Sequence, residues 1–173
     1  MNILMIFDQT QAGLGGKESP DLPLGGKKMA IGAASMLDPA LKEIDGKVIA
    51  CLYCGDGFFE SNEEDVTKKM VAMVKKMAPD VVVCGPAYNY KGYARMCAIL
   101  ADAINKNTDI PAIAAMSVEN EETIAKYKDS VNIVKMPKKG GTGLSNSLKE
   151  ICVLAKKKVD KEDITDYVKQ ICY

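Results

Sequence analysis

The fold is decided by a stretch that reads Asp80-Val81-Val82-Val83-Cys84-Gly85-Pro86-Ala87-Tyr88-Asn89. Its first half is a run of β-branched residues bounded by Pro79 and Gly85, which is typical of a buried strand. The following turn lies at the carboxyl end of that strand, where open α/β sheets bind ligands. Two tyrosines, an amide and a lysine crowd this turn. It therefore indicates either a binding site or a connection whose tyrosines cap the core, and both interpretations stay open.

Strand-like and helix-like patterns alternate along the 173-residue chain. Apolar runs predict strands over residues 2–7, 47–53, 80–84, 110–116 and 131–135. Between them, apolar residues recur at helical spacing, Ser61 and Glu64 predict a capping box, and residues 27–37 are expected to be helical. The alternation indicates a single α/β domain over residues 1–173, a three-layer sandwich with a five-stranded, mainly parallel sheet. Such a sandwich is flavodoxin-like or Rossmann-like.

The composition excludes several functions. Lys and Arg total 23 and Asp and Glu total 23, which argues against a nucleic-acid or membrane-surface role. Histidine is absent, so histidine-based catalysis and histidine metal sites are excluded, and we expect no metal. No apolar run approaches the ~20 residues that span a bilayer. With no basic leader and with cysteines in apolar patterns, we expect a cytoplasmic location.

Polar side chains follow three of the predicted strands. Because parallel strands end at one edge of a sheet, we expect a single cleft there. Its expected members are Asp8, Gln9, Cys54, Asp56, Tyr88 and Asn89. Lys91 and the N-terminus of the helix after Asn89 would supply positive potential, so we expect a small ligand with a carboxylate.

Cys51 and Cys54 have the Cys-x-x-Cys spacing. Residues three apart in a strand point to opposite faces, so we do not expect a redox pair. Cys54 lies at the strand end and is expected to be a site thiol that labels faster than Cys84. Because Asp56 opposes the thiolate, we assign Cys54 a supporting role rather than that of nucleophile.

Two glycine-rich segments are candidate loops. Gly13, Gly15 and Gly16 belong to residues 8–26, which we expect to form a mobile flap over the site or a plain surface loop. This segment does not open directly into a helix, which argues against dinucleotide binding. Gly141, Thr142 and Gly143 precede a predicted helix, and this turn would either bind an anion or be simply solvated.

Four segments together resemble a known family. They read Gln9-x-x-Ala12-Gly13-x-Gly15-Gly16, Cys54-Gly55-Asp56-x-Phe58-Phe59, Gly85-Pro86-Ala87-Tyr88-Asn89 and Ile133-Val134-Lys135. In this order and spacing they resemble the N-terminal part of component B of the glycine, sarcosine and betaine reductases, and more narrowly its large selenoprotein subunit. The resemblance runs from the first strand to about residue 155.

The resemblance implies an anaerobic, multi-subunit system of amino-acid metabolism. In that family a selenocysteine attacks a small amine such as glycine, sarcosine or betaine, and the carboxymethyl group then passes to a second selenoprotein. The family's selenocysteine lies in the C-terminal half of a longer chain, and this sequence has none. We therefore expect no cofactor here, a selenocysteine in a partner chain, and no turnover by this chain alone.

Two functions remain open after the resemblance. The chain is expected to be a subunit or stand-alone domain of such a complex that contributes the binding cleft for a small amino-acid-like substrate. The alternative is a non-catalytic ligand-binding or regulatory module that kept the fold. The basic turn at Lys138 and Lys139 departs from the family pattern. We expect other reductase components as partners, neither nucleic acid nor membrane, and leave homo-oligomer formation open.

Overall fold

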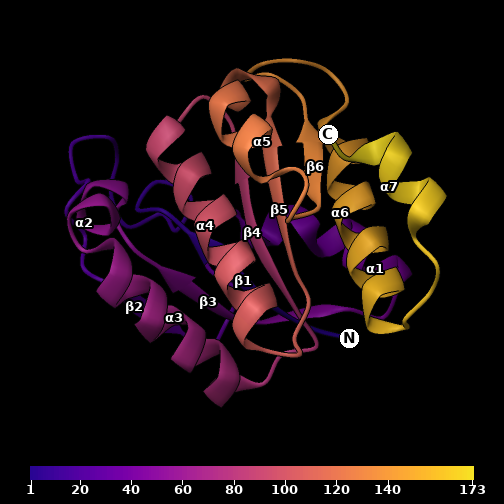
Figure 1. Ribbon diagram of the computed structural model, residues 1–173, viewed down its shortest axis with the longest axis horizontal. Helices are drawn as coiled ribbons and strands as arrows, with labels where there is room; N and C mark the ends of the chain where they lie inside the picture. Colours follow the sequence, from indigo (N-terminus) through magenta and orange to yellow (C-terminus); the bar gives the residue numbers. More distant parts are fainter.

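The sheet at the centre of the molecule has six strands in the order β2-β3-β1-β4-β5-β6 (Figure 1). The computed structural model describes residues 1–173. The strands are β1 (Asn2–Phe7), β2 (Gly25–Lys27), β3 (Lys47–Tyr53), β4 (Val81–Ala87), β5 (Ala112–Ser117) and β6 (Ile133–Met136). All pair in parallel except β2, which pairs antiparallel with the end of β3. The carboxyl ends of the five parallel strands therefore share one edge of the sheet.

Seven α-helices pack around the sheet. They are α1 (Asp38–Glu43), α2 (Asp56–Ser61), α3 (Glu63–Met77), α4 (Lys91–Asn107), α5 (Glu121–Tyr127), α6 (Leu144–Val159) and α7 (Thr165–Ile171). The buried residues of α3 include Val66, Met70 and Val74, which recur at helical spacing and face the sheet. Short 3-10 helices cover Gly32–Leu37 and Val118–Asn120.

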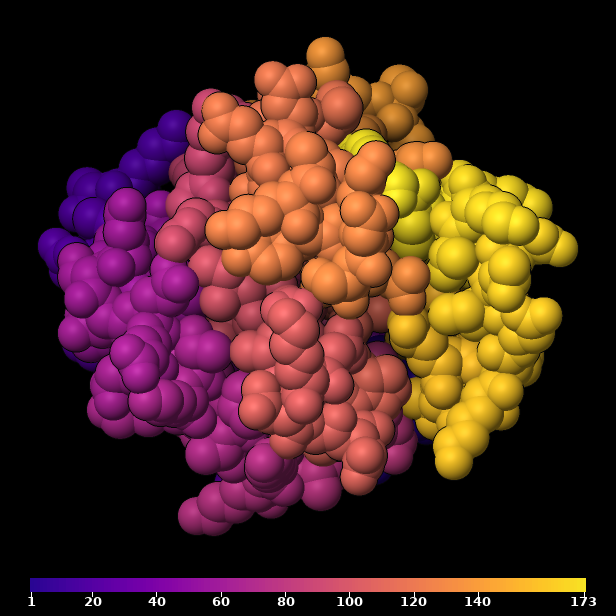
Figure 2. Space-filling view, in the orientation of Figure 1, coloured from indigo at the N-terminus to yellow at the C-terminus, as the bar shows by residue number.

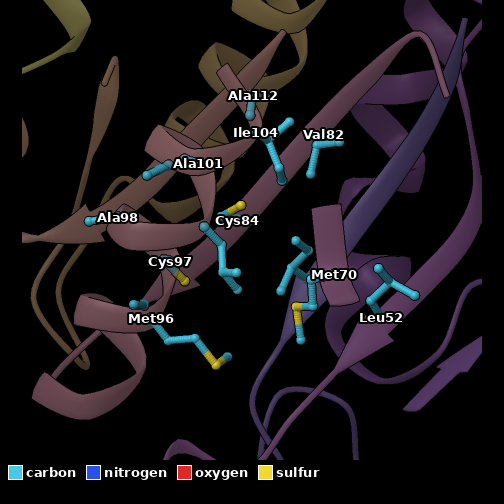
Figure 3. Packing of buried hydrophobic residues seen from close by; sticks show 14 of the residues in the cluster. Leu52, Met70, Val82, Cys84, Met96, Cys97, Ala98, Ala101, Ile104 and Ala112 are labelled. Atoms are coloured by element: carbon cyan, nitrogen blue, oxygen red, sulfur yellow. The ribbon is translucent and has the colours of Figure 1, made fainter. Parts of the chain in front are cut away.

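The helices form two layers, one on each face of the sheet. On one face α3, α4 and α5 pack over alternate strand residues such as Leu4, Leu52 and Val82. Figure 3 shows Met70 of α3 and Cys97 of α4 among these apolar side chains. On the other face α1, α6 and α7 pack over the intervening residues, including Met5 and Val83. The predicted three-layer α/β sandwich is confirmed, and the surface seen in Figure 2 is formed by the helices of the first layer together with the yellow C-terminal segment of α6 and α7 at the right.

The prediction of five strands is wrong by one, because β2 was missed. Two of its three residues are glycines, which have low strand propensity, so only its pairing with β3 identifies it. The predicted helix over residues 27–37 is also wrong. Gly32 has φ of +52°, and a Cβ there would lie 2.0 Å from the carbonyl oxygen of Gln11. A continuous helix cannot pass through this left-handed position.

The predicted capping box does not form. Residues after Gly55 form the short helix α2, and α3 begins only at Glu63, with Asn62 in the N-cap position. The amide of Asn62 instead donates a hydrogen bond of 3.0 Å to the carbonyl oxygen of Phe58. None of the helices combines the length and the apolar character that crossing a bilayer requires.

Candidate functional site

Gln9 and Asp56 join the loops that follow β1 and β3 at the carboxyl edge of the sheet. The Gln9 Nε2 amide donates to Asp56 Oδ1 at 3.0 Å, and the Asp56 backbone N–H donates to Gln9 Oε1 at 3.2 Å. Gln9 is 2% exposed. Asp56 also lies against the first turn of α4, since a Cβ at Gly92 would be 2.6 Å from Asp56 Oδ2. The expected meeting of these loops is confirmed, and three elements are fixed to one another here.

Asp8 immediately precedes Gln9 in the sequence and is fully buried. Its Oδ1 accepts a hydrogen bond of 2.7 Å from the Gln11 N–H, while its Oδ2 has no partner. Burial raises the pKa of this carboxyl from 3.8 to about 6, backbone hydrogen bonds oppose the rise, and the charge of Asp56 adds to it. A buried carboxylate oxygen without a partner is costly, so the ionised Asp8 carboxyl destabilises the fold.

Cys54 lies at this edge but is not accessible. Its side chain is 0% exposed, as is that of Cys84. Burial raises the pKa of the Cys54 thiol to about 12, with a further contribution from Asp56. The expected accessible thiol is therefore wrong, because the side chain points into the core beneath α4 rather than into solvent. Cys51 packs in the cluster on the opposite face, which confirms that the two thiols do not meet.

Tyr88 and Asn89 follow β4 but make no hydrogen bond with Gln9 or Asp56. The Tyr88 ring packs against the cluster on the α6 face, and its hydroxyl is buried without a partner. Burial raises the pKa of that hydroxyl. Asn89 is exposed. The tyrosine thus covers the core, as the alternative interpretation of this turn states, and only its main chain takes part in the polar network of the edge.

Residues after β5 complete that network and were missed by the sequence analysis. The Ser117 hydroxyl donates to the Tyr88 carbonyl oxygen at 3.2 Å, and the amide of Asn120 donates to the same oxygen. Asn120 is 3% exposed, and its Oδ1 has no partner. These residues follow the fourth predicted strand. The expectation that polar residues after a parallel strand reach the carboxyl edge, which was applied to three other strands, would have identified them.

Lys91 is exposed at the start of α4. It lines a hollow of about 40 Å³ together with Glu119, Glu121 and Glu122. Three carboxylates beside one ammonium reduce the positive potential expected there. Lys91 therefore sits in a more acidic setting than a simple carboxylate anchor requires.

The segment with Gly13, Gly15 and Gly16 packs on the edge as a series of turns. The N–H groups of Ala12 and Leu14 donate to the carbonyl oxygens of Asp8 and Gln9 at 3.0 and 2.9 Å. Further along, the carbonyl oxygens of Pro20 and Leu22 accept from Phe58 and Gly55 at 2.9 and 2.8 Å. Lys17 Nζ lies 4.7 Å from the centre of the Tyr90 ring. The segment thus bridges the loop after β3 and the turn before α4.

The turn with Gly141, Thr142 and Gly143 follows β6, which is the last strand of the sheet on the side opposite to β2 and β3. All three residues are exposed. The nearby Lys139 N–H donates to Glu119 Oε2 at 3.5 Å, so a carboxylate already faces this turn. No side chain caps α6.

Two of the three larger surface hollows lie away from the carboxyl edge, and the third reaches Val118 and Glu121, which follow β5 at that edge. Hollows of about 410 and 480 Å³ are lined by residues around Asp109 and Lys158, around Ile49 and Met73, and around Ile124 and Tyr173. No group of three or more Cys, Asp or Glu side chains is arranged to hold a metal ion. The edge therefore offers hydrogen-bonding groups and carboxylates, and its polar atoms are mostly closed over by the loops.

These features define a three-layer α/β domain whose polar edge is built from the loops after β1, β3, β4 and β5. The family described as glycine/sarcosine/betaine reductase selenoprotein B matches residues 1–171. The chain belongs to this family, which confirms the resemblance drawn from the four sequence segments.

Curated relatives agree with this assignment. The chain is 34% identical to the glycine reductase complex component B subunit gamma of Carboxydothermus hydrogenoformans over 151 residues, which cover 87% of this chain and 34% of the relative. It is 30% identical to the sarcosine reductase complex component B subunit beta of Peptoclostridium acidaminophilum, with the same coverage of 87% and 34%. The chain thus spans about a third of the length of these relatives. No solved structure matches the chain.

Proposed function

We propose that the chain is a subunit or stand-alone domain of a glycine/sarcosine/betaine reductase-type complex. In this role its carboxyl edge contributes part of the binding cleft for a small amino-acid-like substrate. The family match over residues 1–171 is the observation that carries the proposal. The relatives named as glycine and sarcosine reductase component B subunits support the same complex type.

The edge has groups suited to both ends of such a substrate. The N-terminus of α4 favours a carboxylate, Lys91 adds a positive charge that its acidic neighbours reduce, and Asp56 favours an ammonium group. Gln9 holds Asp56 in place through two hydrogen bonds. Betaine carries no N–H donor, so a hydrogen-bonding role for Asp56 predicts weaker binding of betaine than of glycine.

Calorimetry of the chain with glycine, sarcosine and betaine tests this proposal. We expect binding that Asp56→Asn weakens and that Asp129→Asn leaves unchanged, because Asp129 is exposed and makes no side-chain hydrogen bond or ion pair. If the wild type binds none of the three, titration is repeated in the presence of a component B chain that carries selenocysteine. Absence of binding in both experiments would refute the cleft.

A partner chain is part of the proposal. All six cysteines are buried, and the chain has no selenocysteine, so the attacking group is proposed to belong to a separate selenoprotein chain. Free cysteines are suited to a reducing compartment, and we place the complex in the cytoplasm. An anaerobic assay of the chain with each amine and a dithiol should give no acetyl phosphate. Turnover, or a carboxymethyl adduct on Cys54, would make the chain an enzyme in its own right.

The alternative is a non-catalytic ligand-binding or regulatory module. The burial of Cys54 and the closed edge favour it over an enzyme that works alone. Restoration of reductase turnover on adding the chain to the other components would support the subunit role. Ligand binding without any effect on turnover would support the module.

A further inference from the structure

The outer edge of β3 is only half covered. The short strand β2 pairs with Cys51, Leu52 and Tyr53, and no strand pairs with the outer side of the preceding residues 47–50. An unpaired strand edge presents free N–H and C=O groups to which another chain can add. Natural proteins commonly protect such edges against pairing with other chains. The surroundings of this edge therefore decide which polypeptide segments can pair with it.

A hollow of about 480 Å³ lies beside this edge. Its floor is formed by Ile49 and Ala50 of β3 and by Met73 and Met77 of α3. Ile49, Met73 and Met77 are only partly buried, although they pack against the core. The helix and the strand edge are close, since a Cβ at Gly26 of β2 would be 3.4 Å from the Met73 methyl group. The free edge of β3 and the apolar floor of the hollow therefore form one continuous surface.

Lysines surround this surface. Lys28 and Lys76 line the hollow, Lys27 ends β2 and Lys47 begins β3. All four are exposed, and none forms an ion pair. Two copies of the chain joined edge to edge would bring eight of these charges together. Like charges at this density oppose self-pairing and favour an acidic partner.

We propose that the half-open edge of β3 is a docking site for an extended, acidic segment of another polypeptide, which adds as a strand beside residues 47–50. Its apolar side chains would fill the hollow over Ile49 and Met73, and its carboxylates would pair with Lys28 and Lys76. The added strand would continue the position of β2 beside β3, starting where β2 ends at Lys27. This surface is distant from the carboxyl edge, so the proposal stands whether or not that edge binds an amine.

The probe is a labelled six-residue peptide with glutamate at positions 1 and 5, valine at position 3 and threonine elsewhere, so that the valine and both glutamates share the strand face that meets the hollow. Fluorescence anisotropy at low salt should show binding that weakens as salt is raised, because the Debye length shortens from ~30 Å at 0.01 M to ~8 Å at 0.15 M. Hydrogen exchange should show new protection of those amides among residues 48–50 that point away from β1. The same peptide with lysine in place of glutamate, and the glutamate peptide interrupted by proline, should not bind.

Charge reversal provides a matched pair of variants. Lys28→Glu combined with Lys76→Glu should weaken binding about tenfold, while Lys75→Glu, on the same helix but outside the hollow, should change it less than twofold. Equal effects of the two changes would overturn the proposal. So would no peptide binding at 1 mM in low salt, equal binding of the lysine peptide, or protection of residues 48–50 by self-association in the absence of peptide.

Discussion

Replacing Asp8 with asparagine tests the electrostatics of the carboxyl edge. Burial raises the pKa of this carboxyl from 3.8 to about 6 in the folded chain, whereas the unfolded chain keeps the ordinary value. Between these two values the folded chain binds more protons than the unfolded one. The free energy of unfolding therefore falls as pH rises from about 4 to about 6. Above that window the ionised carboxylate of Asp8 destabilises the fold.

The size of the effect follows from the two pKa values. The difference between 3.8 and about 6 corresponds to about 3 kcal/mol, at about 1.4 kcal/mol for each tenfold change. Asp8→Asn keeps an oxygen that accepts the Gln11 N–H but puts an unpaired amide where Oδ2 now lies, which costs about 1 kcal/mol. At pH 8 we expect the variant to be more stable than the wild type by about 2 kcal/mol. At pH 4 the gain should disappear.

Urea unfolding followed by circular dichroism measures the stability difference between variant and wild type at pH 4 and at pH 8. Asp129→Asn is the matched control, because it removes one carboxylate from an exposed position and should change stability by less than about 0.5 kcal/mol. A loss of stability for Asp8→Asn that is the same at pH 4 and pH 8 would refute the reasoning. It would mean that the Asp8 carboxylate is stabilised by its surroundings rather than penalised by burial.

Three further changes probe the same edge. Tyr93→Phe should cost about 1–2 kcal/mol in urea unfolding, because the buried Tyr93 hydroxyl donates at 3.0 Å to the Ile6 carbonyl oxygen. Gln9→Glu should lower stability by about 1 kcal/mol at pH 8, where two carboxylates meet, and by less at pH 4. Lys91→Met should weaken calorimetric binding of glycine only about two- to fivefold, since exposed ion pairs contribute about 0.2–1 kcal/mol. Cys54 and Cys84 should react equally slowly with a thiol reagent, as followed by mass spectrometry.

Tyr93→Phe and Gln9→Glu each have a matched control variant. Tyr127→Phe should be nearly neutral, because the Tyr127 hydroxyl donates no hydrogen bond in the structure. Gln170→Glu places the same charge on the exposed face of α7 and should show no pH dependence of this kind. Equal losses in Tyr93→Phe and Tyr127→Phe would argue against the hydrogen bond. Rapid labelling of Cys54 alone would show that the loop over it opens, and a hundredfold loss in Lys91→Met would identify Lys91 as the main anchor.

The sequence predicted the parallel sheet well because the information lies in short local patterns. The β-branched run at 80–84 and the apolar run at 47–53 needed no tertiary contact to be recognised. By contrast, β2 contains two glycines and exists through pairing with β3, which no local pattern encodes. Gly32 likewise turns the chain at a left-handed position set by its contact with the Gln11 carbonyl. Local rules fail where long-range contacts decide the backbone.

The site was predicted in part for a related reason. Strand ends identify which residues reach the carboxyl edge, and Gln9 and Asp56 do meet there. Strand ends do not tell which way a side chain points after the last paired residue. Cys54 turns inward beneath α4, and Tyr88 turns to the opposite face. The polar residues after β5 were overlooked, although the same rule applies to Ser117 and Asn120.

The burial of the thiols limits what this edge can contribute to a reductase. With a pKa of about 12, the Cys54 thiol is ionised at neutral pH in roughly one molecule in 10⁵. Its side chain is also packed in the core, so a substrate carbon would reach it only after α4 or its loop moved away. A polar edge with a fixed carboxylate and no available nucleophile can orient a substrate but cannot attack it. Under the proposed function the attacking atom comes from outside residues 1–173, so adding a component B chain that carries selenocysteine should give the same turnover whether Cys54 is intact or replaced by serine.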